Sequence, residues 1–318
     1  MAPLACYVSE ELICMERICI VTAVFFALLT PTGVQGLPLD IYLSERFVLA
    51  GFPGEGNFAR VSDVAYDMER GLILVTDEGR KRIYEFRSDG APENVLGGEA
   101  DIPFIDEIAA GTGGRLFLLE SSTGRVFTMD RVEKEEITPL EGKKENPEGI
   151  FARGITTSRA GTLYLVDLEG KHLNIRDRDG ALLTSTKSRQ RLKELVAMDI
   201  DSRGRVLVAT REMNPLHLFD SSGEYSRRVE IRDFTTNLPL SDIGGAAFDQ
   251  QGRIWVSYPR DGLVRVFDET GAMVSELGKA SVPGGLFSPT DLEITPMGDV
   301  LILERGYNRI RSFNVDIR

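Results

Sequence analysis

The chain of 318 residues is poor in the side chains that most often build catalytic or metal centres. It contains two histidines, His172 and His217, and one tryptophan. A zinc site with three histidine ligands is therefore excluded by number. A Ser–His–Asp triad is disfavoured because the sequence has no nucleophile elbow and no well-placed base. The glycine-rich turns also lack the Lys-Ser/Thr pair with which a P-loop binds phosphate.

Cysteine is confined to the first residues of the chain. Cys6, Cys14 and Cys19 all precede residue 37, so the rest of the chain can form no disulfide. A folded unit of about 280 residues is large enough to bury a stable core without disulfides. No cysteine directly follows the N-terminal apolar run, which argues against a lipid-modified N-terminus.

No apolar run reaches the roughly 20 residues that a membrane-spanning helix needs. Ile18–Leu29 is almost entirely apolar, and Thr30–Gly36 follows it with small residues at its end. This pattern is typical of a secretory signal peptide, here residues 1–36, and predicts a periplasmic or extracellular protein. Met15 is the better start, because Glu10 and Glu11 occupy positions where a signal peptide needs positive charge. The alternative is an uncleaved anchor that keeps the protein at the membrane.

The sequence has no excess of basic residues. Its net charge is −12, and the leader contains only three Glu and one Arg, so the chain after residue 36 remains near −10. Nucleic-acid binding needs a basic face, so nucleic acid is not expected as the main partner. An acidic surface keeps a protein soluble and monomeric, and it also suits cationic or metal-bearing partners.

What the sequence has in abundance is one repeat, which recurs six times from about residue 60. A turn glycine marks each copy, and successive glycines are 43, 47, 43, 48 and 46 residues apart. These glycines are Gly71, Gly114, Gly161, Gly204, Gly252 and Gly298. A fixed period in this range indicates a propeller or a solenoid.

Each copy contains short runs rich in β-branched and aromatic residues, separated by Gly, Asp and Ser, which predicts strands and turns. In the first copy the expected strands are Asp63–Tyr66, Leu72–Thr76, Ile83–Phe86 and Asn94–Leu96. The second strand of each copy is nearly apolar throughout, as expected where both faces of a sheet are buried. The pattern predicts a single all-β domain over residues 37–318, a six-bladed β-propeller.

The last copy is short of one strand, because the chain ends soon after Arg309–Val315. A separate strand, Arg46–Ala50, precedes the first copy. We expect it to become the fourth strand of the final blade. This pairing closes the ring and removes exposed sheet edges.

The repeats resemble the NHL-repeat family of six-bladed propellers. The family pattern stands in the last copy as Pro289, Asp291, Gly298, Asn308, Arg309-Ile310 and Phe313. Some copies depart from it: Glu120 and Glu304 replace the aspartate that ends the second strand. The resemblance covers essentially the whole chain after the leader. It implies the fold and says little about function, because function depends on sites that differ within a fold.

The first residue of the innermost strand is expected near the mouth of the central channel. From the last copy onward, this position is occupied by Asp291, Asp63, Glu107, Gly154, Ala197 and Gly245. Ring closure makes the three acidic positions neighbours, with Asp106 and Arg153 beside them.

These carboxylates allow three interpretations. Asp63, Glu107 and Asp291 could hold a hard cation such as Ca²⁺. Lactonase-like propellers have an acidic metal site at this place, but theirs includes two Asn, which this position lacks. Hydrolytic catalysis is the second interpretation. The third is that the carboxylates bond local backbone amides in the turns.

The connections between blades are long, whereas the turns between the first two strands of each blade are tight. The long connections are Arg131–Phe151, Ser188–Leu195, Ile231–Ile243 and Gly278–Phe287. Variable loops on a rigid scaffold usually carry binding. We therefore expect a non-enzymatic scaffold that binds a protein or carbohydrate through this face, with no cofactor other than a possible Ca²⁺. The alternative is a metal-dependent hydrolase or lyase that uses the acidic channel mouth.

Overall fold

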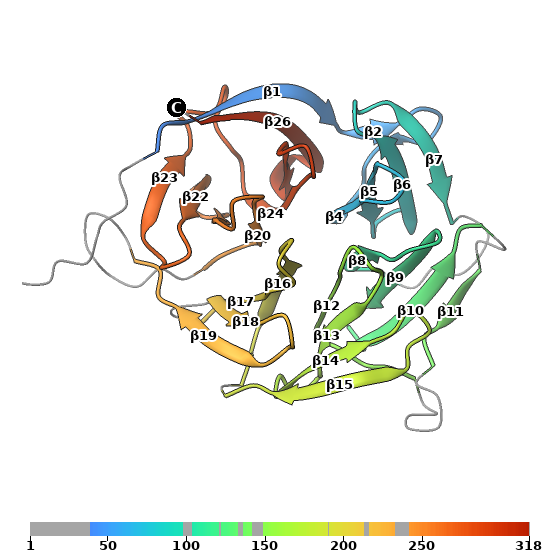
Figure 1. Ribbon diagram of the computed structural model, residues 1–318. Coiled ribbons are helices and arrows are strands. Elements are labelled where there is room, and N and C mark those ends of the chain that lie inside the picture. The colour runs from blue at the N-terminus through green and yellow to red at the C-terminus, as the bar shows by residue number, and fades with distance from the viewer. Residues whose placement is uncertain are drawn as a thin grey trace, which may run out of the picture. The chain divides into compact units, whose positions relative to one another are not determined.

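The computed structural model describes residues 39–97, 104–120, 122–132, 136–141, 149–189, 191–212, 216–232 and 242–317. The expected leader lies outside these residues. Gly36–Arg318 form one compact unit. Within it, six four-stranded antiparallel sheets are arranged as blades around a centre (Figure 1). This arrangement confirms the six-bladed β-propeller that the repeat predicts.

The strands of each blade follow one another outward from the centre. Blade one consists of β4 (Val61–Asp67), β5 (Leu72–Asp77), β6 (Arg82–Arg87) and β7 (Pro92–Leu96). Blade two consists of β8 (Glu107–Ala110), β9 (Arg115–Glu120), β10 (Arg125–Asp130) and β11 (Ile137–Pro139). Blade three consists of β12 (Gly154–Thr157), β13 (Leu163–Val166), β14 (His172–Arg176) and β15 (Leu182–Lys187). Blade four consists of β16 (Leu195–Ile200), β17 (Val206–Thr210), β18 (Leu216–Phe219) and β19 (Tyr225–Val229). Blade five consists of β20 (Ala246–Phe248), β21 (Ile254–Tyr258), β22 (Leu263–Phe267) and β23 (Met273–Leu277). Blade six consists of β24 (Pro289–Ile294), β25 (Val300–Glu304), β26 (Arg309–Ile317) and β1 (Ile41–Leu49). A small hairpin of β2 (Gly51–Phe52) and β3 (Gly56–Asn57) follows β1.

The turn between the first two strands of each blade depends on its glycine. All six repeat glycines have positive φ, from 67° at Gly71 to 86° at Gly298. Side chains other than hydrogen are strained in this conformation. At Gly161 space is limiting as well, since a Cβ there would lie 2.5 Å from the Thr112 hydroxyl oxygen. The spacing of these glycines therefore reflects the length of one blade, and each blade has one of them.

The core lies between the blades, where the apolar second strands pack against their neighbours. Between blades six and one, Val64 and Val75 share a cluster with Leu301 and Leu303. Trp255 is 1% exposed in β21, and its Nε1 donates to the Asp249 Oδ2 at 3.0 Å. The tryptophan therefore belongs to the core. Burial of such side chains contributes about 1.5–3 kcal/mol each.

The N-terminal strand completes the last blade. β1 pairs antiparallel with β26, with Ile41 opposite Ile317 and Leu49 opposite Ile310 (Figure 1). The expected strand Arg46–Ala50 falls within this pairing except for its last residue, and the observed strand begins five residues earlier. The Leu39 N–H also donates to the Val274 carbonyl of β23 at 2.9 Å. The start of the described chain is thus tied to both blades five and six.

One expected connection contains a strand. The sequence predicts only a connection at Arg131–Phe151, but β11 lies within it, pairs with β10 and is the fourth strand of blade two. β11 is a three-residue edge strand, and none of its three side chains is buried. Its sequence therefore shows no apolar run. Parts of this connection and most of Ile231–Ile243 lie outside the described residues.

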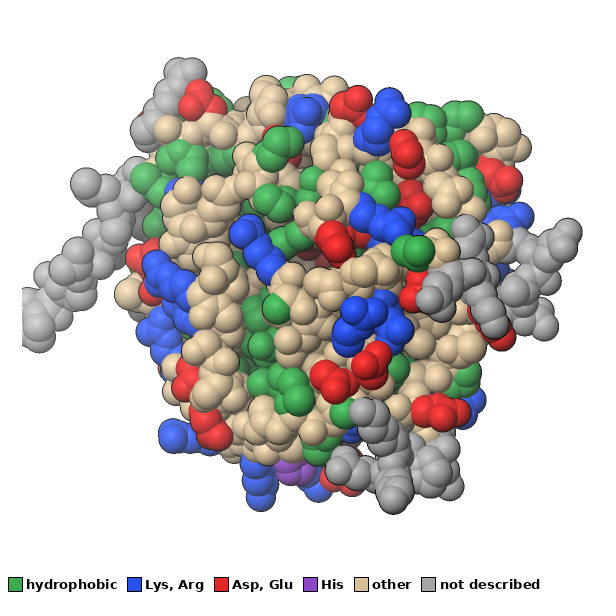
Figure 2. Space-filling model, turned by 45° about the vertical axis from the view of Figure 1, so that its right-hand side comes forward, with side chains coloured by type: hydrophobic (Ala, Val, Ile, Leu, Met, Phe, Trp, Pro, Cys, Tyr) green, Lys and Arg blue, Asp and Glu red, His purple; other side chains and the backbone are tan. Residues whose placement is uncertain are grey.

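The outer surface mixes charges of both signs. Figure 2 shows acidic and basic side chains interspersed over the face that it presents, with smaller hydrophobic areas between them. The helix η1 spans Arg305–Tyr307. In the part of the chain that the structure describes, no helix has the length and apolar character needed to cross a membrane.

Candidate functional site

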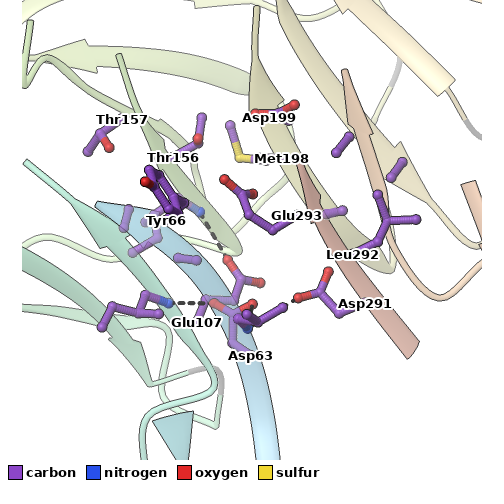
Figure 3. A pocket seen from close by; sticks show the side chains of 18 of the residues that line it. Asp63, Tyr66, Glu107, Thr156, Thr157, Met198, Asp199, Asp291, Leu292 and Glu293 are labelled. Atoms are coloured by element: carbon purple, nitrogen blue, oxygen red, sulfur yellow. Dashed lines mark hydrogen bonds between the residues drawn. The ribbon is translucent and has the colours of Figure 1, made fainter. Parts of the chain in front are cut away.

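A cavity of about 490 Å³ lies at the centre of the ring and is lined mainly by the innermost strands. We call it the central cavity. The carboxyl side chains in its wall include Asp63, Glu107, Asp199, Asp291 and Glu293 (Figure 3). They come from β4, β8, β16 and β24. The acidic residues expected at the channel mouth are therefore brought together, and two further ones join them.

The carboxylates join neighbouring blades. Asp63 Oδ2 accepts a hydrogen bond of 2.7 Å from the Ile108 N–H of blade two. Glu107 Oε2 accepts one of 3.1 Å from the Ile155 N–H of blade three. In the repeat alignment, Asp63 corresponds to Glu107 of blade two, and Glu107 corresponds to Gly154 of blade three. In both cases the donor is the backbone N–H of the residue that follows this corresponding position. The third interpretation expected local amides, and Asp63 Oδ1 does accept a hydrogen bond of 2.9 Å from the adjacent Val64 N–H. The carboxylates therefore bond amides of the next blade in addition to local ones.

The same relationship recurs elsewhere in the ring. Asp291 Oδ2 accepts from the Val64 N–H of blade one at 3.4 Å, and Asp199 Oδ2 accepts from the Phe248 N–H of blade five at 2.6 Å. In blade five, Gly245 occupies the position that Asp291 occupies in blade six. A Cβ at Gly245 would lie 2.7 Å from Asp291 Oδ1. A side chain there would collide with the Asp291 carboxyl.

Asp291 and Asp63 hydrogen-bond to each other through their carboxyl groups. Burial raises the pKa of Asp291 well above its usual value, and the nearby charge of Asp63 raises it further. Burial also raises the pKa of Asp63, whereas the hydrogen bond from Asp291 lowers it. The protonated Asp291 therefore donates to Asp63, as expected for two carboxyls that cannot both ionise at close range.

Burial raises the pKa of the other cavity carboxyls too. The pKa of Glu107 is raised to about 8 by burial and then by the charge of Asp63. Burial raises the pKa of Asp199 to about 6. For Glu293 the pKa is well above its usual value, because of burial and then the charge of Asp199. Protonated carboxyls donate as well as accept hydrogen bonds, so this wall can bind hydroxyl groups.

The remaining predicted site residues lie differently. Asp106 lines the central cavity. Arg153 does not: it is exposed, and its Nε donates to the Leu168 carbonyl. Arg211 and Arg305, which the sequence did not single out, line the cavity on the side where β17 and β25 end.

The sequence also missed Asp199 and Glu293 as cavity residues. Each lies two residues after the predicted position, at Ala197 and Asp291 respectively. Side chains two residues apart on a strand point to the same face. Applying this two-residue period to the innermost strands would have predicted Asp199 and Glu293 as cavity residues. Among the described residues, no three His, Cys, Asp or Glu side chains are arranged to hold a metal ion.

Both histidines lie away from the cavity. His172 begins β14, with Nδ1 2.7 Å from Asp167 Oδ2. His217 is buried in β18, and burial, with the charge of Arg228, lowers its pKa to about 4. Neither lines the cavity wall.

The turns between the second and third strands lie on the same side of the ring as the connections between blades. We call this side the inter-blade face. Five non-glycine residues in the described chain have left-handed backbone, and all five lie there: Lys81, Glu194, Asp242, Ser288 and Asn308. Such conformations cost about 1–3 kcal/mol each and cluster at functional sites.

Large aromatic side chains are exposed on the same face. Phe104, Phe287 and Tyr307 are 49%, 52% and 57% exposed. Lys81 Nζ lies 5.0 Å from the centre of the Phe104 ring. An exposed apolar group next to charged side chains is a common feature of binding surfaces.

Comparisons with known proteins support the fold. No protein-family model and no curated protein matches the chain. Among solved structures, it is similar to virginiamycin B lyase from Staphylococcus aureus, with 13% identity, a TM-score of 0.57 and 88% of each chain covered. It is also similar to a gluconolactonase from Xanthomonas campestris, with 15% identity and a TM-score of 0.60, over 88% of this chain and 97% of that one. A putative gluconolactonase has 17% identity and a TM-score of 0.59, over 89% and 94%. At these identities the likeness shows the propeller fold alone.

Proposed function

We propose that this protein is an exported propeller of the NHL type that binds a protein or carbohydrate partner through its inter-blade face. The observation that carries the proposal is the concentration of exposed aromatic side chains and non-glycine left-handed residues on that face. The cavity carboxylates fit a scaffold role, because they bond backbone amides of neighbouring blades. Among the described residues, the opposite side has no non-glycine residue with left-handed backbone.

The proposal includes export as a monomer. The apolar run Ile18–Leu29 and the small residues up to Gly36 support a cleaved leader. N-terminal sequencing of the native protein is expected to begin near Leu37, in the soluble fraction outside the cytoplasm. Recovery of intact Met15 in the membrane fraction would favour an anchor instead.

Binding is tested by selecting ligands without assuming their class. The purified protein is screened on a glycan array and against a peptide-display library. A selected ligand should lose binding to Phe104→Ala/Tyr307→Ala and keep binding to Met297→Ala. Met297 is 66% exposed in the turn after β24, on the opposite side of the ring. Ligands that respond only to Met297→Ala would show that the binding face is assigned wrongly.

A hydrolase or lyase is the second candidate, and the Asp63–Asp291 pair favours it. A carboxyl and a carboxylate that share a hydrogen bond beside a cavity can act as general acid and base. The solved structures similar to this chain include a virginiamycin B lyase and a gluconolactonase. Opening of D-glucono-δ-lactone, with and without Ca²⁺, tests this candidate. Activity lost in Asp291→Asn supports it, whereas a rate equal to that without protein opposes it.

A further inference from the structure

Two aromatic rings form a fixed platform on the inter-blade face. The ring centres of Phe287 and Tyr307 lie 4.7 Å apart, with an angle of 41° between the planes. More than half of each side chain is exposed. The Phe287 ring rests on Gly306, where a Cβ would lie 2.2 Å from Phe287 Cδ1. Glycine is therefore needed at residue 306 for the two rings to meet.

The surrounding residues hold both rings in place. The Phe287 N–H donates to Glu304 Oε1 at 2.7 Å, and Glu304 is fully buried. The Arg309 guanidinium carbon lies 4.6 Å from the centre of the Tyr307 ring. Ser288 and Asn308, which follow the two aromatic residues, have φ values of 50° and 48°. A platform held this firmly loses little conformational entropy when a ligand binds.

The platform adjoins the mouth of the central cavity. The same short helix, η1, contains Arg305, which lines the cavity, and Tyr307. Thr290 and Asp291 also line the cavity, and they follow Phe287 by three and four residues. An apolar surface and a polar, carboxyl-lined space therefore meet at η1.

A sugar ring matches both surfaces, because its C–H face is apolar and its edge carries hydroxyl groups. Aromatic faces pack well against apolar groups, and carboxyl and guanidinium groups hydrogen-bond to hydroxyls. The net charge of the chain after residue 36, near −10, disfavours an anionic ligand. These properties together favour an uncharged saccharide over uronic acids and over acidic peptides.

We propose that Phe287 and Tyr307 bind one unit of a neutral oligosaccharide, while the adjacent unit enters the cavity mouth and hydrogen-bonds to Arg305 and Asp291. The inference rests on the proposed binding through the inter-blade face and names its ligand class.

The test uses the protein without its leader and four neutral tetrasaccharides: cello-, malto-, laminari- and chitotetraose. Isothermal titration calorimetry should detect binding of at least one. Phe287→Ala and Tyr307→Ala should each weaken that binding about tenfold, as expected when an aromatic contact at the centre of a binding site is removed. Tyr307→Phe should bind nearly as well as the original, since the stacking ring remains. Met297→Ala, on the opposite side of the ring, serves as the matched control.

The outcomes separate this inference from the proposed function. If no tetrasaccharide binds at millimolar concentration, but a peptide selected on the protein is lost in Phe104→Ala/Tyr307→Ala, the saccharide is wrong and the binding face stands. Saccharide binding that is unchanged in both ring variants overturns the platform. If neither class binds through this face, both proposals fail. Urea unfolding of each variant shows whether a loss of binding is caused by misfolding. Because the Phe287 and Tyr307 side chains are largely exposed, we expect both variants to remain folded.

Discussion

The Asp63 carboxylate accepts a hydrogen bond of 2.7 Å from the backbone N–H of Ile108, 45 residues further along the chain. The acceptor belongs to β4 and the donor to β8, so the bond joins the innermost strands of two blades. Because the bonded groups belong to different blades, the cavity carboxyls contribute to the alignment of neighbouring sheets. The same groups face the space in which a ligand would bind, so their protonation affects both stability and binding.

Stability is expected to fall as the pH rises from 6.5 to 8, because of Glu107. Its pKa in the folded protein is about 8, against 4.5 as the ordinary value. The folded state therefore binds more protons than the unfolded state over this range, so raising the pH favours unfolding. His217, with a folded pKa of about 4 against an ordinary value of 6.5, opposes this slope near pH 6.5, where only its unfolded form binds protons. Its opposing contribution disappears toward pH 8, so the decrease due to Glu107 dominates. Urea unfolding at several pH values measures the slope.

Glu107→Gln is the matched variant for the pH experiment, because it keeps an oxygen that can accept from the Ile155 N–H. We expect the slope to become clearly shallower in this variant. Asp291 and Glu293, whose pKa values are also raised, account for the slope that remains. A slope that is the same in both proteins would contradict the assignment to Glu107.

Ring closure by β1 predicts a large effect of a small deletion. Removal of Arg46–Ala50 should lower the free energy of unfolding by several kcal/mol, because it unpairs β26 and uncovers blade six. Leu49→Ala alone should cost about 2–4 kcal/mol, since Leu49 is 5% exposed. Ser44→Ala, at an exposed position of the same strand, is the control. An unchanged melting temperature in the deletion variant would show that the strand contributes little to closure.

A buried ion cluster links blades one and two. Arg131 bonds both Asp67 and Glu85, and its Nε donates to the Gly114 carbonyl at 3.0 Å. Arg131→Met should destabilise the protein by about 3–5 kcal/mol, because it leaves two buried carboxylates without their cation. Thermal and urea unfolding measure this cost. Arg203→Met, which removes an exposed partner of Glu269, should change stability by no more than about 0.5 kcal/mol.

Calcium distinguishes the two functional candidates. If Asp63, Glu107 and Asp291 act as a scaffold, millimolar Ca²⁺ should change the melting temperature little. The triple variant Asp63→Asn/Glu107→Gln/Asp291→Asn should then lose only modest stability. If the three hold a cation, Ca²⁺ stabilises the folded state by mass action, and the triple variant loses this effect. We expect the first result. A rise of several degrees that disappears in the triple variant would make a metal-dependent enzyme the leading candidate.

Much of the fold could be predicted from local features of the sequence. Gly71 and Gly298 stand where the backbone needs positive φ, and apolar runs such as Leu72–Thr76 stand where both faces of a strand are covered. β11 could not be predicted in the same way. Its position at the edge of a sheet requires no apolar pattern, and only its pairing with β10 reveals it.

The candidate site was only partly accessible to the same reasoning. The repeat alignment brings Asp63, Glu107 and Asp291 to one side of the ring, and the structure places all three in the cavity wall. It also suggested Arg153, whose side chain instead lies against the Leu168 carbonyl. Alignment gives the position of a residue along a strand, but the direction of a long side chain depends on its neighbours.

The sequence by itself determined the number of blades, the position of their turns and the strand that closes the ring. These features depend on local backbone conformation and on which residues are apolar. Only the tertiary structure decided which amide each carboxylate bonds, that Asp63 and Asp291 share a hydrogen bond, and that Phe287 and Tyr307 form one surface beside the cavity. Those relationships, and the raised pKa values in the cavity, arise from distances across the closed ring and from the exclusion of water at its centre.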